Sequence, residues 1–351
     1  MVCIMRADSI VTFLCCAAAS LACGLHSRTP IDTDPQFAPV PATAAGLELG
    51  PGGYAVQSYG GGAYMVTEGS YQAFFLITTK GVIVVDCPPT IGHRMLYAIG
   101  NMTSIPVTHL IYSHYHADHI GGVTIFGEDI RTIAHSETAR HLLETPDPNR
   151  PVPKQIFDKN YTLHVGNQTL ELAYLGEAHI SGNIFIYAPI QKVLILIDVV
   201  FPGWLPFAAL GEAKNVPAYY HAHDQILQYD FDHYIGGHVG RAGNRTDVLN
   251  QQEYILDLKQ NCELAVNLSA TDDPSIGAAA LLGPVSAKNP GNSWAPFKVY
   301  LDTLAQYCAN KTNEKWLGKL GGVDVFGFEN AWLLIESLRI DYGVLGPFAT
   351  V

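Results

Sequence analysis

Three histidines and an aspartate stand within the six residues 114–119, in the segment SHYHADH. A folding core does not tolerate so many metal-binding groups unless a cation is there to coordinate them. Residues 107–112 before the segment are largely apolar and β-prone, and two glycines follow it, so we expect a buried strand that ends in a loop. In an extended stretch His114 and His116 point the same way, and Asp118 and His119 lie past the bend. One loop can therefore supply ligands to two metal sites.

Three further apolar, strand-like runs each lead into a residue that can bind a metal. Residues 171–175 lead to His179, 193–197 to Asp198, and 234–237 to His238. A lone histidine carries no weight in a chain with 14 of them. A surface patch of chance composition does not explain the repeated order, so the set indicates a metal centre.

In order and spacing these motifs, between about Tyr54 and about Arg241, resemble those of the metallo-β-lactamase-fold hydrolase superfamily. The resemblance implies an α/β fold, a four-layer αββα sandwich with the metals at one edge. It also implies a ligand set: His114, His116 and His179 for a first zinc ion, Asp118, His119 and His238 for a second, and Asp198 as a bridge between them.

Asp86 ends the strand-like run 82–85 and matches the aspartate that supports the ligand loop in this family. A simpler role, capping the turn before Pro88, is open as well.

The resemblance implies a dinuclear zinc hydrolase, with two Zn²⁺ ions per chain and a metal-bridging hydroxide as the nucleophile. Zinc lowers the pKa of bound water to about 7, so hydroxide is available near neutral pH. Asp118 would orient the nucleophile and later pass a proton to the leaving group. Iron and manganese accept the same ligands.

A bridging carboxylate at Asp198 resembles the glyoxalase, lactonase, thioesterase and phosphodiesterase branches more than the antibiotic-degrading enzymes, which place a cysteine there or lack a bridging side chain. We therefore expect cleavage of an ester-like bond in a small, fairly hydrophobic substrate, a lactone first. Alternatives are a thioesterase, a β-lactamase-like amide hydrolase, or a non-catalytic binding protein that the metals only stabilise.

Substrate selectivity is expected on loops near the metals. Trp204 and Phe207, in the Gly- and Pro-containing stretch that follows Asp198, are candidates for an apolar pocket wall, with packing between layers as the alternative. Tyr219 and Tyr220 are candidates to place a phenol over a substrate carbonyl. A further pair, His221 and His223, is expected in a solvated loop.

Composition limits the partners. With 351 residues, 48% hydrophobic and 15% charged, the chain can bury a sizeable core. The net charge of −12 argues against a nucleic-acid substrate, which needs a basic surface to neutralise its phosphates. A small-molecule substrate is expected.

The chain divides into four expected regions. Residues 1–24 carry an apolar run of signal-peptide length, too short to span a membrane. An irregular linker at 25–50, a metallo-β-lactamase-like domain at 51–245 and a helical region at 246–351 come after it. Early strands are expected to flank a turn at 60–62, with further strands at 73–78, 82–85, 131–134, 169–175, 184–187 and 193–197. Helices are expected at 91–99, 136–143 (capped by Ser136), 247–266, 278–282, 296–309 and 329–338.

Export is expected from the leader and from six N-x-[ST] sequons, at Asn101, Asn160, Asn167, Asn244, Asn267 and Asn310. The protein is therefore expected to be secreted and N-glycosylated. Loss of the leader leaves Cys87, Cys262 and Cys308. If a disulfide forms we expect Cys262 with Cys308, and three buried free thiols are the alternative.

Overall fold

The central strands of this protein are apolar at successive positions, so both of their faces must be buried. In strand β3 (Gln72–Ile77), Phe74 and Leu76 join one apolar cluster, whereas Ala73 and Phe75 join another. The side chains of β4 (Val82–Val85) are divided between the same two clusters. This alternation places a core on each side of the sheet.

The computed structural model describes residues 34–349. The expected signal peptide and the first part of the expected linker lie outside the described residues. From Phe37 onward the described residues belong to one compact unit, which holds both sheets and all the helices named below.

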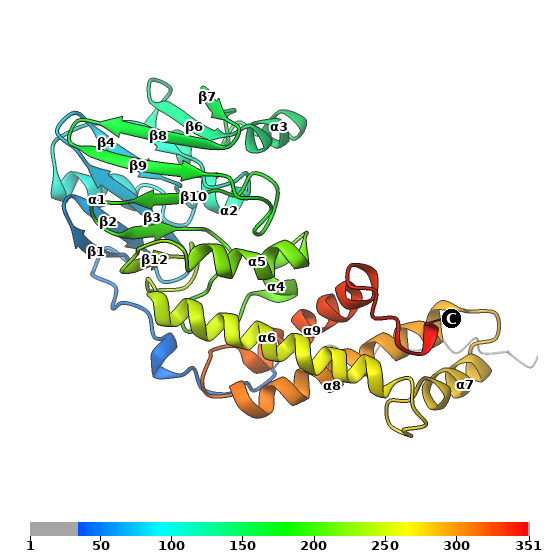
Figure 1. Ribbon diagram of the computed structural model, residues 1–351. Helices are drawn as coiled ribbons and strands as arrows, with labels where there is room; N and C mark the ends of the chain where they lie inside the picture. The colour runs from blue at the N-terminus through cyan, green and yellow to red at the C-terminus, as the bar shows by residue number, and fades with distance from the viewer. Residues whose placement is uncertain (1–33, 350–351) are drawn as a thin grey trace, which may run out of the picture. The chain divides into compact units, whose positions relative to one another are not determined.

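Two sheets stack face to face within this unit (Figure 1). The first has seven strands in sequential order: β1 (Ala55–Gly60), β2 (Ala63–Thr67), β3, β4, β5 (Val107–Ile111), β6 (Arg131–His135) and β7 (Gln155–Phe157). The second has five strands in the order β12 (His233–Ile235), β11 (Val193–Ile195), β10 (Phe185–Ala188), β9 (Gln168–Ala173) and β8 (Asn160–Val165).

Helices cover the outer face of each sheet. The outer side of the first sheet packs against α1 (Arg94–Met102), α2 (Ala117–Ile120) and α3 (Ser136–Glu144). The outer side of the second shares an apolar cluster with α4 (Ala208–Glu212), α5 (Val216–Ile226) and α6 (Arg245–Leu268). The remaining helices, α7 (Ala278–Lys288), α8 (Trp294–Trp316) and α9 (Val323–Ile340), extend this cluster by packing on α6, on α4 and on one another (Figure 1). The expected αββα sandwich with a helical C-terminal region is confirmed.

Several expected elements differ in detail. His135, not Ser136, is the N-cap of α3, because its ring Nδ1 accepts the Glu137 backbone N–H. His221 and His223 lie on helix α5 instead of a solvated loop: His221 is exposed, but His223 is fully buried. Positions two apart on a helix face different sides, so one ring meets solvent and the other the core.

A disulfide joins Cys262 of α6 to Cys308 of α8, as expected, and Cys87 is a buried free thiol. Among the described residues, no helix combines the length and the apolar character that crossing a membrane requires.

Candidate metal centre

The ligand loop starts where β5 ends and is held there by Asp86. This aspartate follows β4, which pairs in parallel with β5, and its Oδ1 accepts the Ser113 backbone N–H at 2.8 Å. The Ser113 hydroxyl in turn lies 2.9 Å from Nδ1 of His114 and fixes the orientation of that imidazole. Burial raises the pKa of the Asp86 carboxyl to about 6.

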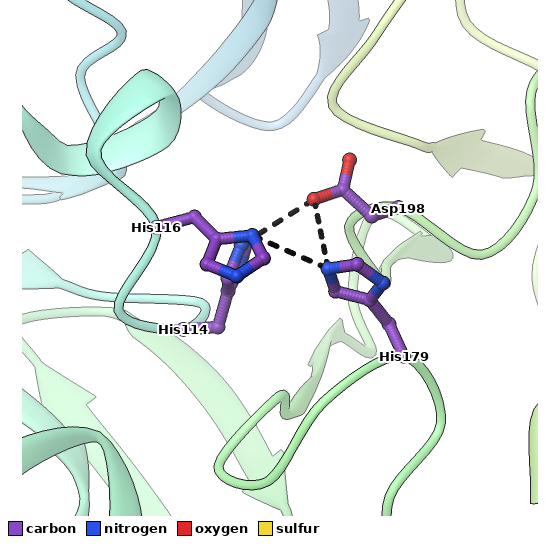
Figure 2. Close-up of side chains that lie close together, drawn as sticks. All are labelled: His114, His116, His179 and Asp198. Atoms are coloured by element: carbon purple, nitrogen blue, oxygen red, sulfur yellow. Dashed lines mark hydrogen bonds and ion pairs between the residues drawn. The ribbon is translucent and has the colours of Figure 1, made fainter. Parts of the chain in front are cut away.

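The first cluster of metal-binding groups consists of His114, His116, His179 and Asp198, whose ligand atoms lie within 4.8 Å of one another. Figure 2 shows the three imidazoles and the carboxylate turned toward a common centre. Asp198 Oδ2 is 3.3 Å from His114 Nε2 and 3.6 Å from His179 Nε2. His116 Nδ1 is 3.3 Å from His179 Nε2.

The second cluster consists of Asp118, His119 and His238. Nε2 of His119 and Nε2 of His238 are 3.1 Å apart, and Asp118 Oδ2 lies 3.5 Å and 3.7 Å from them. Asp198 reaches this cluster too, with Oδ2 at 3.1 Å from His119 Nε2 and Oδ1 at 2.9 Å from His238 Nε2. The two clusters therefore adjoin at one carboxylate.

These distances fit divalent cations. Ligand atoms about 2.0–2.1 Å from a tetrahedral ion are about 3.4 Å from one another. The buried His114 Nε2 atom has no hydrogen-bond partner among residues 34–349, which is costly unless a cation accepts its lone pair. The cluster of histidines and aspartates suggests divalent metal binding.

Electrostatics keep His114, His179 and Asp198 in the protonation states that metals need. Burial lowers the pKa of His114 well below its usual range and that of His179 to about 4, so both imidazoles are neutral at pH 7. Burial opposes ionisation of Asp198, but the neighbouring imidazoles, His119 foremost, outweigh it and hold the pKa of its carboxyl well below its usual range.

The backbone is left-handed at Asp198 (φ 65°) and at Val239 (φ 61°), which is next to His238. This conformation costs a β-branched residue such as valine about 1–2 kcal/mol, whereas aspartate adopts it more readily. Gly237 has φ 89°, and a Cβ there would lie 2.6 Å from Ile197 Cγ2 and 3.0 Å from His119 Cε1. Strain at strand ends that carry candidate ligands is typical of a functional site.

A cavity of about 560 Å³ opens over the clusters, and its lining includes Tyr71, Asp118, Phe207 and Glu212. Tyr71 was not predicted from the sequence, although its hydroxyl is 3.4 Å from Asp118 Oδ2 and its ring centroid 4.6 Å from that of His238. Trp204 and Phe207 line an adjoining apolar cavity.

The expectation for Tyr219 and Tyr220 is wrong. The Tyr219 hydroxyl donates to the Val199 carbonyl inside the core, and that of Tyr220 donates to the Ile255 carbonyl of α6. Both phenols are directed into packing between α5 and its neighbours, because the helix turns this face away from the metal cavity.

A model of the metallo-beta-lactamase superfamily matches residues 66–259, more than half of the chain. The chain belongs to the metallo-β-lactamase superfamily. Its histidine and aspartate clusters fit the metal-dependent hydrolases of this superfamily.

Individual relatives of this superfamily member are distant. It is 26% identical over 190 residues to a protein named 2,4-dinitroanisole O-demethylase subunit alpha of Nocardioides sp. strain JS1661, a match that covers 53% of this chain and 57% of the relative. It is 26% identical over 136 residues to metallo-beta-lactamase IND-1 of Chryseobacterium indologenes, covering 38% and 56% of the two chains. The chain thus spans little more than half the length of these curated relatives.

The solved structure of a metallo-beta-lactamase from Pontibacter korlensis superposes with a TM-score of 0.50 at 20% identity. The superposition covers 57% of this chain and 97% of that one. This likeness concerns the fold, and it leaves much of the present chain outside the superposition.

Proposed function

We propose that this protein is a dinuclear zinc hydrolase that cleaves an ester-like bond in a small, fairly hydrophobic substrate, with a lactone as the first choice. The observation that carries the proposal is the position of Asp198. Its carboxylate lies within 3.6 Å of Nε2 atoms from both clusters, as a carboxylate that bridges two ions must. Two bound divalent cations would supply Lewis acidity and lower the pKa of bound water to about 7.

The chain's own groups would position the reactants. The Asp118 side chain is 43% exposed to the cavity, so it can orient a nucleophile and hold the proton that the leaving group needs. Tyr71 can donate a hydrogen bond to the same carboxylate or to a substrate oxygen. Tyr71 directly precedes β3 and Asp118 lies on α2, and both line the same cavity.

The lining of the cavity favours an uncharged substrate. It contains the carboxylates of Asp118, Asp198 and Glu212 but no lysine or arginine from the described residues. A polyanionic substrate would need cationic partners beyond the two proposed metal ions, and this lining does not offer them.

Turnover by the zinc-loaded full chain tests the proposal. Dialysis against a chelator should abolish hydrolysis of a lactone, and zinc should restore it, because the metal ions would supply the hydroxide nucleophile. The panel should include a thioester, a β-lactam and 2,4-dinitroanisole, the compound that the name of one relative contains. If one of these compounds is turned over faster than the lactone, it replaces the lactone as the proposed substrate. Zinc uptake without turnover of any compound would favour the alternative of a non-catalytic binding protein.

Asp198→Asn is the matched variant, because it keeps the shape and the left-handed backbone but removes the charge. We expect it to lose zinc and activity together. Asp230→Asn is the control, since that side chain is 80% exposed on the surface.

We also propose that the protein is secreted and N-glycosylated. The six sequon asparagines are all exposed, and the disulfide between Cys262 and Cys308 suits an oxidising compartment. Treatment of exported protein with an N-glycosidase should lower its mass, and an unchanged mass would contradict the proposal.

A further inference from the structure

An apolar cavity of about 380 Å³ adjoins the metal cavity and shares Ser70, Phe201, Phe207 and His238 with it. We name it the apolar pocket, and its principal lining residues are Phe201, Trp204, Leu205, Phe207, Val325 and Phe326. Among the described residues no aspartate, glutamate, lysine or arginine lines it, and its lining includes the imidazole of His238, a candidate ligand. One end of the apolar pocket therefore begins at the metal centre.

Its far wall comes from the C-terminal region. Val325 and Phe326 belong to the first turn of α9, whereas Trp204 and Leu205 belong to the loop that follows Asp198. The rings of Phe207 and Phe326 pack against each other with their centroids 4.8 Å apart. Because Phe207 lines both cavities, this pair stands where the two cavities meet.

Two kinds of hydrogen bond hold the loop after Asp198 and the α9 region together: bonds between backbone groups, and bonds from one buried side-chain amide. The Leu205 N–H donates to the Gly321 carbonyl at 3.1 Å, and the Gly321 N–H donates to the Gly203 carbonyl at 2.9 Å. The fully buried Asn330 of α9 accepts from the Leu210 N–H at 2.7 Å and donates to the Pro206 carbonyl at 2.9 Å. The pocket is thus formed before any ligand enters.

We propose that the apolar pocket receives an uncharged hydrocarbon arm of the substrate, and that α9 sets the length of arm accepted. This proposal rests on the proposed function. A charged arm would lose its hydration without gaining a partner here, whereas each methylene buried improves affinity about fourfold. The volume lies within the usual range of pockets for small molecules.

The test measures binding of a homologous series of carboxylates, from acetate to decanoate, to the zinc-loaded full chain by calorimetry. These acids are the products of ester cleavage, so the carboxylate can lie at the metals with its chain in the apolar pocket. We expect affinity to rise about fourfold per methylene and then to level off when the pocket is full. Affinity that does not depend on chain length overturns the proposal.

Val325→Trp should fill the pocket. We expect it to weaken octanoate binding at least tenfold while leaving acetate binding unchanged. Val299→Trp is the matched control, because Val299 lies exposed on α8 and should keep the chain-length dependence of the native protein. An unchanged dependence in Val325→Trp overturns the proposal.

Phe326→Ala provides a second variant that opens the pocket instead of filling it. We expect the plateau to move to longer acids, and an unmoved plateau overturns the proposal. Because the readout is binding, it is separate from the test of catalysis. If affinity depends on chain length but no substrate is turned over, the hydrolase proposal is wrong and the pocket proposal holds. If a substrate is turned over but affinity does not depend on chain length, the pocket proposal is wrong and the hydrolase proposal holds.

Discussion

At the scale of single residues, Tyr71 is the side chain whose role is most open to test. Burial and the carboxylate of Asp118 raise its pKa to about 12, so the phenol is protonated at neutral pH and can donate. Tyr71→Phe removes one such hydrogen bond, worth about 1 kcal/mol. We expect kcat to fall about three- to tenfold with unchanged zinc content, measured by steady-state kinetics and elemental analysis.

Tyr97→Phe is the control for this change, because Tyr97 is 64% exposed on α1. Equal kcat values for the native protein and the Tyr71→Phe variant would mean that this hydroxyl does not contribute to turnover.

The sequence predicted the ligand candidates better than the other residues of the cavity. Each ligand candidate ends an apolar run or belongs to the segment 113–119, and this local pattern is visible without a structure. Tyr71 has no such pattern. It meets the centre only because an antiparallel bridge to His238 joins positions far apart in the chain.

At the scale of elements, helix α6 holds the loop after Asp198 through one buried amide. Gln251 Oε1 accepts the Phe201 N–H at 2.8 Å, and its Nε2 donates to the Val199 carbonyl at 2.6 Å and to His223 Nε2 at 3.0 Å. Gln251→Leu leaves these buried groups unpaired. We expect a loss of about 2–4 kcal/mol in the free energy of unfolding and weaker zinc binding, from denaturant unfolding and metal titration.

Gln252→Leu is the control, because the next side chain on α6 makes only an exposed hydrogen bond to Asp224. It should change stability by less than about 0.5 kcal/mol. Similar losses from the two variants would mean that the buried amide does not hold the loop.

The same network predicts a dependence of stability on pH. Burial lowers the pKa of His223 to about 4, whereas the unfolded value is about 6.5. Between these values the unfolded chain binds a proton that the folded chain does not, so stability falls as pH falls from 6.5 toward 4. The contribution amounts to about 3 kcal/mol.

Denaturant unfolding of the native protein and of His223→Gln across this range checks the prediction. The variant should lack this part of the slope, because it has no imidazole to protonate. If the free energy of unfolding depends on pH in the same way in the two proteins, the prediction is wrong.

Elements with apolar runs were predicted well, and β4 has the expected bounds. Strands β7 and β8 and helix α5 were not predicted. β8 does carry a strand signal that was missed, because the apolar Tyr161, Leu163 and Val165 alternate with polar residues. β8 forms a hairpin with β9, the next strand along the chain. Helix α5 mixes histidines and tyrosines with small residues and has no clear apolar period.

At the scale of the whole molecule, the disulfide between Cys262 and Cys308 closes a loop with a sequence separation of 46 residues. Cross-linking a loop of this size lowers the entropy of the unfolded chain and stabilises the fold by about 4 kcal/mol. We expect the double variant Cys262→Ala, Cys308→Ala to lose about 3–4 kcal/mol in denaturant unfolding. Reducing agent should lower the free energy of unfolding of the native protein but not that of the double variant. An equal decrease in both proteins would contradict this account.

The four-layer fold was predictable because the ligand motifs come in a known order and the strands between them are apolar. The contribution of α9 to the apolar pocket was not. It depends on contacts such as Asn330 with Pro206, more than a hundred residues apart, and an amphipathic pattern does not say what a helix will face.

The metal content of the full chain tests the central claim most directly. Elemental analysis after zinc loading and dialysis should give about two zinc ions per chain for the native protein, because Asp198 connects two separate ligand clusters. A ratio near one, or none, would contradict the dinuclear account.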